Sequence, residues 1–501
     1  MHEKKVLFTL LILLFILAAF TACGKMSAAP ASPSPALVSE DPEPSPEPTP
    51  EPEPVSVVLS SPEGLELTVY ETDADISLGD AAFIPGLIEN AELLPAIRTI
   101  RLEDSLAFTL QELEELRAAF PEAQVLYRVV IDGKEFPADS TVIDLSALPA
   151  DRIGEAVREL GKLPALQKVE LTPDVSVTAD PARIAESGNG AVFNDNLTIG
   201  QVAELAASRP DVVFDYRFLL YGKAVSTADE RLEYVDVKIG DDGVESVIRP
   251  IMPAMSSLNY LKLDRCEVKS PVMAQLRDDF PDVKIVWRVY FSSYGQTGDG
   301  SFAVYNCLTD TEKVWATGCV TDQFATELQY CTDVKYLDLG HNCITNVDFV
   351  RNMPDLEVAI LSITWLESLE PLASCPKLEY LECFSTNIED LSPLASCTNL
   401  KHLNTGSPRA PHPPTDLSPL YGLDLERLYC TSSKIPVAQQ EEFKALHPDC
   451  ECEFGMVDPT RGHWKFLDGN YMNTAPENRN EVYARIYEIF GYDSPSRNQS
   501  K

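Results

Sequence analysis

The sequence predicts an α/β solenoid, a fold in which repeated units stack on one another along the chain. Three observations predict this fold class. The chain has 501 residues, of which 45% are hydrophobic and 24% charged, so it can form a large core and is not disordered throughout. The C-terminal half repeats an apolar pattern at a regular interval, and the first half repeats a longer block. Because each unit of a solenoid needs only its neighbours, one such fold can span a chain of this length.

The N-terminus has the plan of an export signal. Lys4 and Lys5 precede an apolar run from Val6 to Phe20, which is too short for a membrane-spanning helix. The following residues 20–24, Phe-Thr-Ala-Cys-Gly, resemble a bacterial lipobox. The resemblance implies that residues 1–22 are a lipoprotein signal peptide and that Cys23 carries the lipid. A secretory signal with an incidental cysteine is the alternative.

Residues 23–54 are predicted to be a stalk behind that lipid. Prolines alternate with glutamates over residues 40–54. Proline fixes φ and the glutamates repel one another, so an extended spacer is expected rather than a packed unit. The stalk would hold the following domain away from the membrane, with the lipid as its anchor.

Residues 55–94 are assigned to an N-terminal cap and residues 95–330 to degenerate long repeats. In the second region, helix-like stretches end in Pro and lead into strands, as at Phe120-Pro121 and Phe280-Pro281. Turn residues follow two of these strands, at Asp132-Gly133 and Tyr221-Gly222, and they predict hairpins inserted between the repeats.

Residues 331–455 carry the regular repeats. Each unit reads L-x-x-L-x-L, then a polar turn and a second apolar segment, and the units start at residues 334, 356, 378, 400 and 425. A Pro-rich insertion at residues 409–414 accounts for the longer last step. This pattern resembles the leucine-rich repeat, in particular the 22-residue repeats of the internalins. The resemblance implies parallel strands on a concave face, although Asn342 alone supplies the inward asparagine of that family.

Residues 456–501 are predicted to be a C-terminal appendage with one amphipathic helix over 478–490. Val482, Ile486 and Ile489 recur at helical spacing, and we expect them to dock on the last repeat.

Composition and motifs argue against several functions. The net charge of −38, from 40 basic and 78 acidic residues, disfavours nucleic-acid binding. The sequence contains none of the common hydrolase, zinc-protease, phosphate-loop or C-x-x-C motifs, so neither an enzyme nor a metal or other cofactor is predicted. Cys331, Cys375 and Cys397 occupy the same position of their repeats, and Cys383 and Cys430 replace inward leucines. They are interpreted as core residues rather than disulfides.

The candidate ligand-binding residues are those expected to point outward from the concave strands. This set is unusually aromatic and apolar for exposed positions, which is typical of binding surfaces. The alternative is that the appendage or a hairpin lies over it. The predicted patch consists of Tyr336, Val358, Ile360, Tyr380, Phe384, His402, Arg427 and Tyr429.

Together these features predict a non-catalytic lipoprotein, held by its N-terminal lipid on the outer face of a bacterial cytoplasmic membrane. Its solenoid would present a surface for a protein or glycan ligand, in adhesion or envelope interaction. The alternatives are a lipoprotein that binds or senses a small solute, which is usually two-lobed, and a cell-wall enzyme with its site in the inserted hairpins.

Overall fold

The computed structural model describes residues 54–103, 106–172, 186–193, 196–296, 302–406, 413–455, 464–468, 470 and 473–492. The chain divides into two compact units, Met1–Pro54 and Val55–Lys501, and all elements below belong to the second. The predicted signal peptide, lipid-bearing Cys23 and stalk lie outside the described residues, except for Pro54. No helix in the described part is long and apolar enough to cross a membrane.

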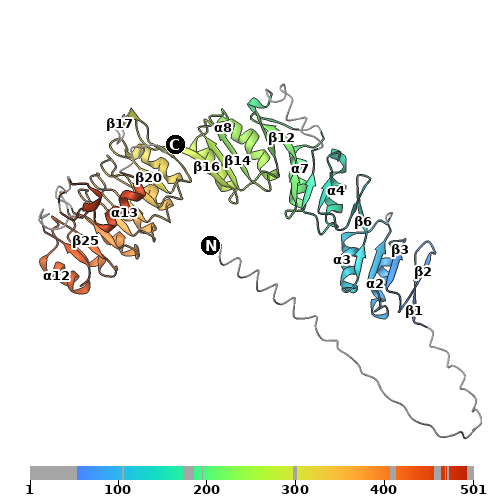
Figure 1. Ribbon diagram of the computed structural model, residues 1–501. Coiled ribbons are helices and arrows are strands. Elements are labelled where there is room, and N and C mark those ends of the chain that lie inside the picture. The colour runs from blue at the N-terminus through green and yellow to red at the C-terminus, as the bar shows by residue number, and fades with distance from the viewer. Residues whose placement is uncertain are drawn as a thin grey trace, which may run out of the picture. The chain divides into compact units, whose positions relative to one another are not determined.

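The second unit begins with an antiparallel hairpin and a three-stranded parallel sheet (Figure 1). The hairpin is β1 (Ser56–Ser60) with β2 (Glu66–Tyr70), and the sheet is β3 (Asp75–Leu78), β4 (Thr99–Leu102) and β5 (Gln124–Leu126). The connections contain α2 (Phe83–Glu89), η1 (Ala91–Leu93) and α3 (Leu110–Ala119). Thr109 and Glu112 form a capping box that starts α3, because each side chain bonds the other residue's backbone N–H.

Hairpins then interrupt the parallel strands, as the turn residues predict. β6 (Arg128–Ile131) pairs with β7 (Lys134–Pro137), and β12 (Arg217–Leu220) pairs with β13 (Lys223–Ser226). Both turns are residue pairs with positive φ, 47° and 73° at Asp132-Gly133 and 48° and 77° at Tyr221-Gly222. Such pairs match the twist of a two-residue hairpin. Each hairpin ends one parallel sheet before the next begins.

Two further sheets follow the same plan. One contains β8 (Val142–Asp144), β9 (Lys168–Glu170) and β11 (Val213–Asp215), with η2 (Ala150–Arg152), α4 (Ile153–Leu160), η3 (Ser187–Asn189) and α7 (Ile199–Ser208) in the connections, while β10 (Ala191–Val192) pairs with β12. The other contains β14 (Arg231–Val235), β15 (Tyr260–Asp264), β16 (Lys284–Tyr290) and the antiparallel β19 (Asn306–Leu308). Its helical segments are α8 (Gly240–Gly243), η4 (Val244–Ile248), α9 (Arg249–Ile251), η5 (Met252–Ala254) and α10 (Ser270–Asp279), and β17 (Gly295–Gln296) pairs with β18 (Phe302–Ala303).

The regular repeats form a ladder of seven parallel strands. These are β20 (Lys313–Trp315), β21 (Tyr336–Asp338), β22 (Val358–Ile360), β23 (Tyr380–Glu382), β24 (His402–Asn404), β25 (Arg427–Tyr429) and β26 (Glu451–Glu453). The ladder therefore starts one strand before the first repeat identified in the sequence. Tyr336, Val358, Tyr380 and His402 are register partners in successive repeats, as predicted.

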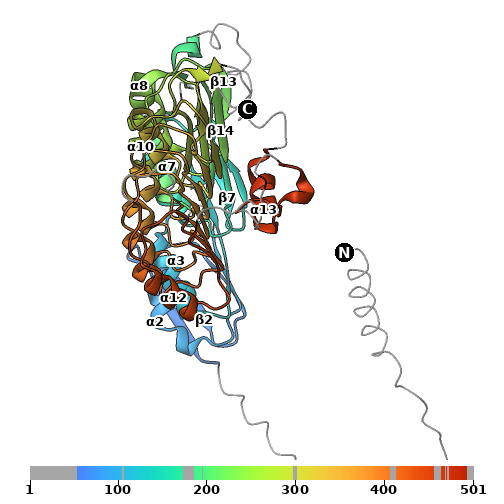
Figure 2. The same ribbon diagram turned by 90° about the vertical axis from the view of Figure 1, so that its left-hand side faces the viewer.

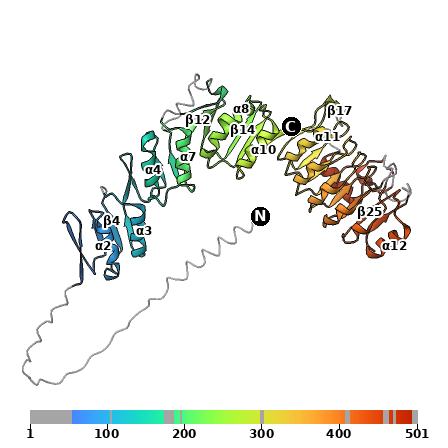
Figure 3. The ribbon, with the colours of Figure 1, turned by 180° about the vertical axis from the view of Figure 1, so that it is seen from behind.

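Short helices occupy the side opposite to the strands (Figure 2). α11 (Asp322–Ala325) with η6 (Thr326–Tyr330) begins the series and α12 (Val437–Leu446) ends it (Figure 3). Between them lie the 3₁₀ turns η7 (Asp348–Asn352), η8 (Glu370–Ser374), η9 (Ser392–Ser396) and η10 (Ser418–Leu420). Pro371 and Pro393 start two of these turns, where a missing N–H costs nothing.

The ladder encloses a continuous core of leucine and cysteine side chains. Cys331, Cys375, Cys383, Cys397 and Cys430 are fully buried in this core, as the repeat register predicts. Asn342 donates hydrogen bonds to the carbonyls of Ala316 and Leu339 at 2.8 and 3.0 Å. In the next two repeats, the hydroxyls of Thr364 and Thr386 donate to the carbonyl three residues earlier, both at 2.7 Å. Threonine thus replaces the missing asparagines in part.

Candidate functional site

The candidate site lies on the strand face of the ladder, where residues stack in two outward rows. One row contains Tyr336, Val358, Tyr380, His402 and Arg427, and the other contains Asp338, Ile360, Glu382, Asn404 and Tyr429. The middle residue of each strand faces the core. All predicted patch residues except Phe384 belong to these rows. Phe384 lies two residues after β23 and is half-buried.

The C-terminal segment, defined as the described residues from Trp464 to Tyr492, lies over this face (Figure 2). We call the area beneath it the covered face. Val358, Ile360, Tyr380 and Tyr429 are all buried and pack against the segment. The segment contributes Trp464, Phe466, Tyr483, Ile486 and Phe490. The sequence left two interpretations of the patch, an open ligand-binding surface or a surface covered by the appendage or a hairpin. In the structure, the appendage covers it. Ligand binding at the patch stays a prediction.

Trp464 is the central apolar contact of the covered face. Its indole Nε1 donates to the Tyr380 hydroxyl at 2.8 Å, and its ring centroid lies 5.1 Å from that of Tyr429. The Arg427 guanidinium stacks 4.6 Å from the Trp464 ring and donates to its carbonyl at 3.1 Å. With 2% of its surface exposed, Trp464 buries a large apolar area and satisfies its N–H, which is the arrangement a buried indole needs.

Charged contacts surround this apolar centre. Lys465 Nζ lies 2.8 Å from Oε1 of the fully buried Glu382. Burial opposes the charge on Lys465, but the Glu382 carboxylate raises the lysine pKa above its ordinary value. The Tyr492 hydroxyl donates to Asp338. Burial raises the pKa of Asp338 to about 6, although the hydrogen bonds to its carboxylate act in the opposite direction.

The helix of the segment is well defined at both ends. α13 (Glu481–Phe490) is capped by Asn480, whose side chain accepts from the Tyr483 N–H, and it ends at Gly491 with φ 65°. Before it, η11 (Pro476–Asn478) is held by Asn478 Nδ2, which donates to Asp468 at 2.8 Å. The described part of the appendage thus contains a helix, which starts three residues later than the expected 478.

The helix extends over more of the ladder than the last repeat, on which it was expected to dock. Val482 lies beside Arg427 and Glu451 at the end of the ladder. Nearer the start of the ladder, Lys313 Nζ donates to the Ile489 carbonyl at 2.8 Å and Arg485 pairs with Glu379 at 3.4 Å. Ile486 is buried as expected, but Val482 and Ile489 are only partly buried. The aromatic and acidic rows along these strands supply the complementary surface.

His402 illustrates the electrostatics beneath the cover. Burial lowers its pKa to about 4, and the nearby Arg427 acts in the same direction. Its Nε2 is 3.9 Å from the Glu426 carboxylate. The imidazole is therefore neutral at pH 7, and it packs 6.1 Å from the Tyr380 ring.

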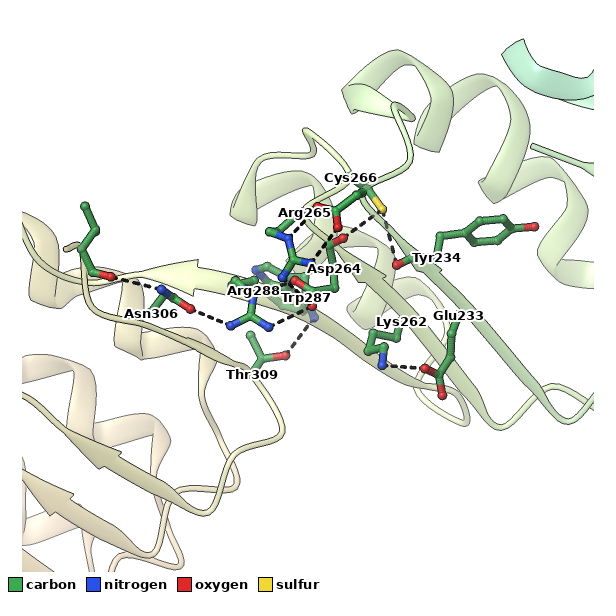
Figure 4. Close-up of polar contacts among 12 residues, drawn as sticks. Glu233, Tyr234, Lys262, Asp264, Arg265, Cys266, Trp287, Arg288, Asn306 and Thr309 are labelled. Atoms are coloured by element: carbon green, nitrogen blue, oxygen red, sulfur yellow. Dashed lines mark hydrogen bonds and ion pairs between the residues drawn. The ribbon is translucent and has the colours of Figure 1, made fainter. Parts of the chain in front are cut away.

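A second strand face, that of β14, β15 and β16, carries charged side chains that pair with one another (Figure 4). We call it the exposed face. Its edges are exposed at Arg231 and Tyr290, whereas Asp264 and Val286 near its centre are buried. Arg288 forms a two-pronged ion pair with Asp264 at 2.7 and 2.9 Å, and both side chains are nearly buried. This pairing lowers the pKa of Asp264. Arg265 pairs with Asp236 at 2.6 and 2.8 Å, with its side chain 41% exposed.

Other outward residues of the exposed face form a mixed surface. Lys262 Nζ lies 2.5 Å from Glu233, and the Arg231 guanidinium lies 3.4 Å from the Tyr260 ring centroid. Tyr290 is 44% exposed. Positive, negative and aromatic groups thus alternate over three neighbouring strands, which suits a large polar ligand better than an apolar one.

Sequence reasoning missed the residues that decide which face is open. Trp464, Lys465 and Phe466 form a short run of aromatic and cationic residues. Such a run complements the aromatic and acidic side chains of the covered face, and it was the signal in the sequence that could have predicted the cover. Arg288 stands in a recurring block, Trp287-Arg288-Val289, but its partner Asp264 lies 24 residues earlier. The pair follows only from the parallel register of β15 and β16.

No metal site is found among the described residues, where His, Cys, Asp and Glu side chains form no group of three or more that could hold an ion. His341, His402 and His447 lie within the described part of the chain, whereas His412 and His463 lie outside it. The absence of a catalytic function stays a prediction.

Comparison with known proteins gives solved structures but no family assignment. No family model matches the chain, and no curated protein matches it. An internalin from Listeria monocytogenes is 15% identical, with 73% of this chain and 77% of the internalin covered and a TM-score of 0.24. A leucine-rich-repeat protein from Leptospira interrogans is 15% identical, with 76% and 100% covered and a TM-score of 0.25. The functional domain of InlJ from Listeria monocytogenes is 12% identical, with 80% and 68% covered and a TM-score of 0.23.

TM-scores this low do not establish a shared fold, so the assignment rests on this chain's own geometry. Three features define the repeat: parallel strands paired in register from one repeat to the next, an inward apolar residue in the middle of each of these strands, and a 3₁₀ turn between successive strands from β20 to β25. The chain therefore has a leucine-rich-repeat fold.

Proposed function

We propose that this protein is a non-catalytic binding protein on a bacterial cell surface, anchored through a lipid on Cys23 and raised on the stalk of residues 23–54. Its solenoid binds a protein or glycan ligand by the strand side. The lipobox-like sequence at residues 20–24 and the Pro/Glu-rich spacer support the anchoring. The exposed face supports the binding role, and it is the observation on which the proposal rests.

The exposed face suits a large polar ligand for two physical reasons. Its central charges are already ordered by mutual pairing, as in Asp264 with Arg288, so a ligand meets a preorganised surface. Around this pair, Arg265 and Tyr290 remain 41% and 44% exposed, and an arginine and a tyrosine are residue types that often dominate binding energy.

The predicted patch is retained as a second binding surface. It includes Tyr380 and Tyr429, and it becomes available when the C-terminal segment leaves the covered face. A ligand there must first displace the contacts of Trp464. Its affinity is therefore expected to be lower than it would be for the same patch without the C-terminal segment.

Capture from envelope, host-surface and matrix extracts tests this function. The probe is the chain from residue 23 onward with Cys23→Ser, which removes the lipid but keeps the stalk. The binding variant carries Lys262→Ala, Arg265→Ala and Tyr290→Ala. A matched control carries Arg351→Ala, Lys444→Ala and Leu446→Ala, three exposed residues outside the strand faces.

We expect the probe and the control to capture the same ligand and the binding variant to lose most of it. Because the surface is charged, capture should also weaken as salt rises from about 50 to about 500 mM, conditions under which exposed charges are increasingly screened. Equal capture by all three proteins would contradict a role of the exposed face. Capture that rises when Trp464→Ala is introduced would assign the ligand to the predicted patch instead.

A further inference from the structure

Two buried cysteines meet where the four-stranded sheet ends and the seven-stranded ladder begins. Cys307 lies in β19 and Cys331 directly follows η6, and their Sγ atoms are 3.7 Å apart. They are 4% and 0% exposed. The first cysteine belongs to the sheet of the exposed face and the second to the ladder of the covered face.

This junction lacks the strand pairing that holds the rest of each sheet together. β19 pairs with β16, whereas β20 pairs with β21, and no ladder connects β19 or β16 with β20. A backbone hydrogen bond crosses it, from the Ser293 N–H to the Cys319 carbonyl at 3.1 Å. Side chains add further contacts: Arg277 donates to the Tyr330 carbonyl at 3.0 Å, and the Trp287 and Tyr330 rings lie 5.6 Å apart. Since each unit of a solenoid is stabilised by its neighbours, a junction without a strand ladder is a point at which a covalent link has a large effect.

We propose that Cys307 and Cys331 form a disulfide bond that joins the two sheets. A disulfide needs its Sγ atoms at about 2.05 Å, so the two atoms must move closer together than their present contact. The bond closes a loop between residues 24 apart, which contains β20, α11 and η6. It therefore fixes the first unit of the ladder to the preceding sheet.

The oxidant is a small disulfide such as oxidised glutathione. The thiolate of one cysteine attacks a glutathione sulfur, forms a mixed disulfide and releases one glutathione. The second thiolate then attacks the protein sulfur of the mixed disulfide and releases the other glutathione. Two electrons and two protons pass from the cysteines to glutathione. Because both thiols are buried in the folded chain, the exchange takes place before the junction has closed.

The other buried thiols follow a different arrangement. Cys375 and Cys397 occupy equivalent positions of successive repeats, and their Sγ atoms approach the backbone carbonyls of Val350 and Leu372 at 3.6 and 3.4 Å. Each of them behaves as a small apolar side chain with a weak S–H donor. They provide a matched control, since they are as buried as Cys331 but lie within one continuous ladder.

The test refolds the full chain with Cys23→Ser in a buffer of reduced and oxidised glutathione. Free thiols are then alkylated, and the chain is digested and mapped by mass spectrometry. We expect a peptide pair linked through Cys307 and Cys331, lighter by two hydrogens than the reduced pair, and a melting temperature that falls on reduction. Cys307→Ala should remove both the linked pair and the effect of reductant, whereas Cys375→Ala should keep both.

Complete alkylation of Cys307 and Cys331 in chains that have regained the native circular dichroism spectrum would overturn the proposal. So would a linked pair that leaves the melting temperature insensitive to reductant, because the bond would then not join the sheets in the folded state. Both readouts use purified protein and are independent of where the protein resides. Failure of the proposed surface location therefore leaves this result unchanged.

Discussion

The covered face and the exposed face belong to similar parallel sheets but have different chemistry. The covered face is aromatic around Tyr380 and Tyr429 and contains a buried carboxylate, Glu382, which pairs with a lysine from outside the ladder. On the exposed face, charges pair within the sheet, as Asp264 does with Arg288. An apolar strand face requires a cover, whereas charged side chains can satisfy one another within the sheet.

The difference teaches that exposure in a solenoid cannot be inferred from strand position alone. A residue that points outward from a strand stays exposed to solvent only if its side chain is polar or forms an ion pair within the sheet. Burial of aromatic side chains is worth about 1.5–3 kcal/mol each, so the aromatic rows strongly favour any segment of the chain that can cover them.

Removing the central aromatic contact should have the largest effect on this comparison. Trp464→Ala is expected to weaken docking of the C-terminal segment by about 3–5 kcal/mol, the usual cost of truncating a buried tryptophan. Hydrogen exchange should then show loss of protection in α13 but not in β14–β16. Trp365→Ala, at a side chain that is 60% exposed, is the control and should change neither. Retained protection of α13 in Trp464→Ala would show that the cover does not depend on this contact.

The buried ion pair provides the second test. Lys465→Met leaves the Glu382 carboxylate buried without its cation and should destabilise the covered face by about 3 kcal/mol. Adding Glu382→Met removes the unpaired buried carboxylate, so the double variant should regain most of the stability that Lys465→Met loses. Thermal unfolding monitored by near-UV circular dichroism checks this order. A double variant less stable than Lys465→Met would mean that the pair is not the main role of either residue.

Acidity should act on the covered face through Asp338. Its pKa is raised to about 6 in the folded chain from an ordinary value of 3.8, so the folded state holds the proton more tightly than the unfolded state. The contribution of Asp338 to stability is therefore greatest below pH 4 and declines as the pH rises to about 6, by about 2–3 kcal/mol in total. Asp338→Asn should remove this part of the pH dependence of stability.

The measurement is hydrogen exchange of α13 between pH 4 and pH 7, corrected for intrinsic rates. His402, with a pKa lowered to about 4, has the opposite sign, because its contribution is lost as the pH falls through 6.5 toward 4. His402→Gln is thus the matched comparison. If Asp338→Asn and the parent chain show the same pH dependence, Asp338 is not the group that titrates.

The smallest stability effect is expected on the exposed face. Arg265→Ala removes a partly exposed pair with Asp236, which should cost about 0.5 kcal/mol, yet it should reduce ligand capture markedly. Denaturant unfolding and the capture assay, performed on the same preparation, check the two parts separately. A loss of stability as large as that of Lys465→Met would make Arg265 a structural residue rather than a binding one.

The sequence predicted the repeat well because its signal is local. Regularly spaced leucines, Gly-containing hairpin turns and an amphipathic C-terminal helix each follow from a short stretch of chain, and the structure contains all three. The buried thiols were predicted for the same reason, since Cys375 and Cys397 repeat the register.

The state of the candidate site could not be predicted because it depends on contacts between distant residues. Trp464 reaches Tyr380 across 84 positions, and Tyr492 reaches Asp338 across 154. Periodicity places Tyr380 on the outward side of its strand, but nothing in the repeat says what lies above it. The aromatic run around Trp464 was too short to be recognised as the matching surface.

The hairpins that follow the first two parallel sheets also affect how this chain would respond to force. A protein held by its N-terminus and pulled at a bound ligand carries tension along the sequence, and backbone ladders resist tension cooperatively. Here the ladders stop at β6–β7 and again at β12–β13. Extension should therefore occur in steps of whole sheets rather than strand by strand, with the seven-stranded ladder as the longest step. If the chain is anchored and bound to a ligand as proposed, it would lengthen in stages under a sudden load while the remaining sheets stay folded.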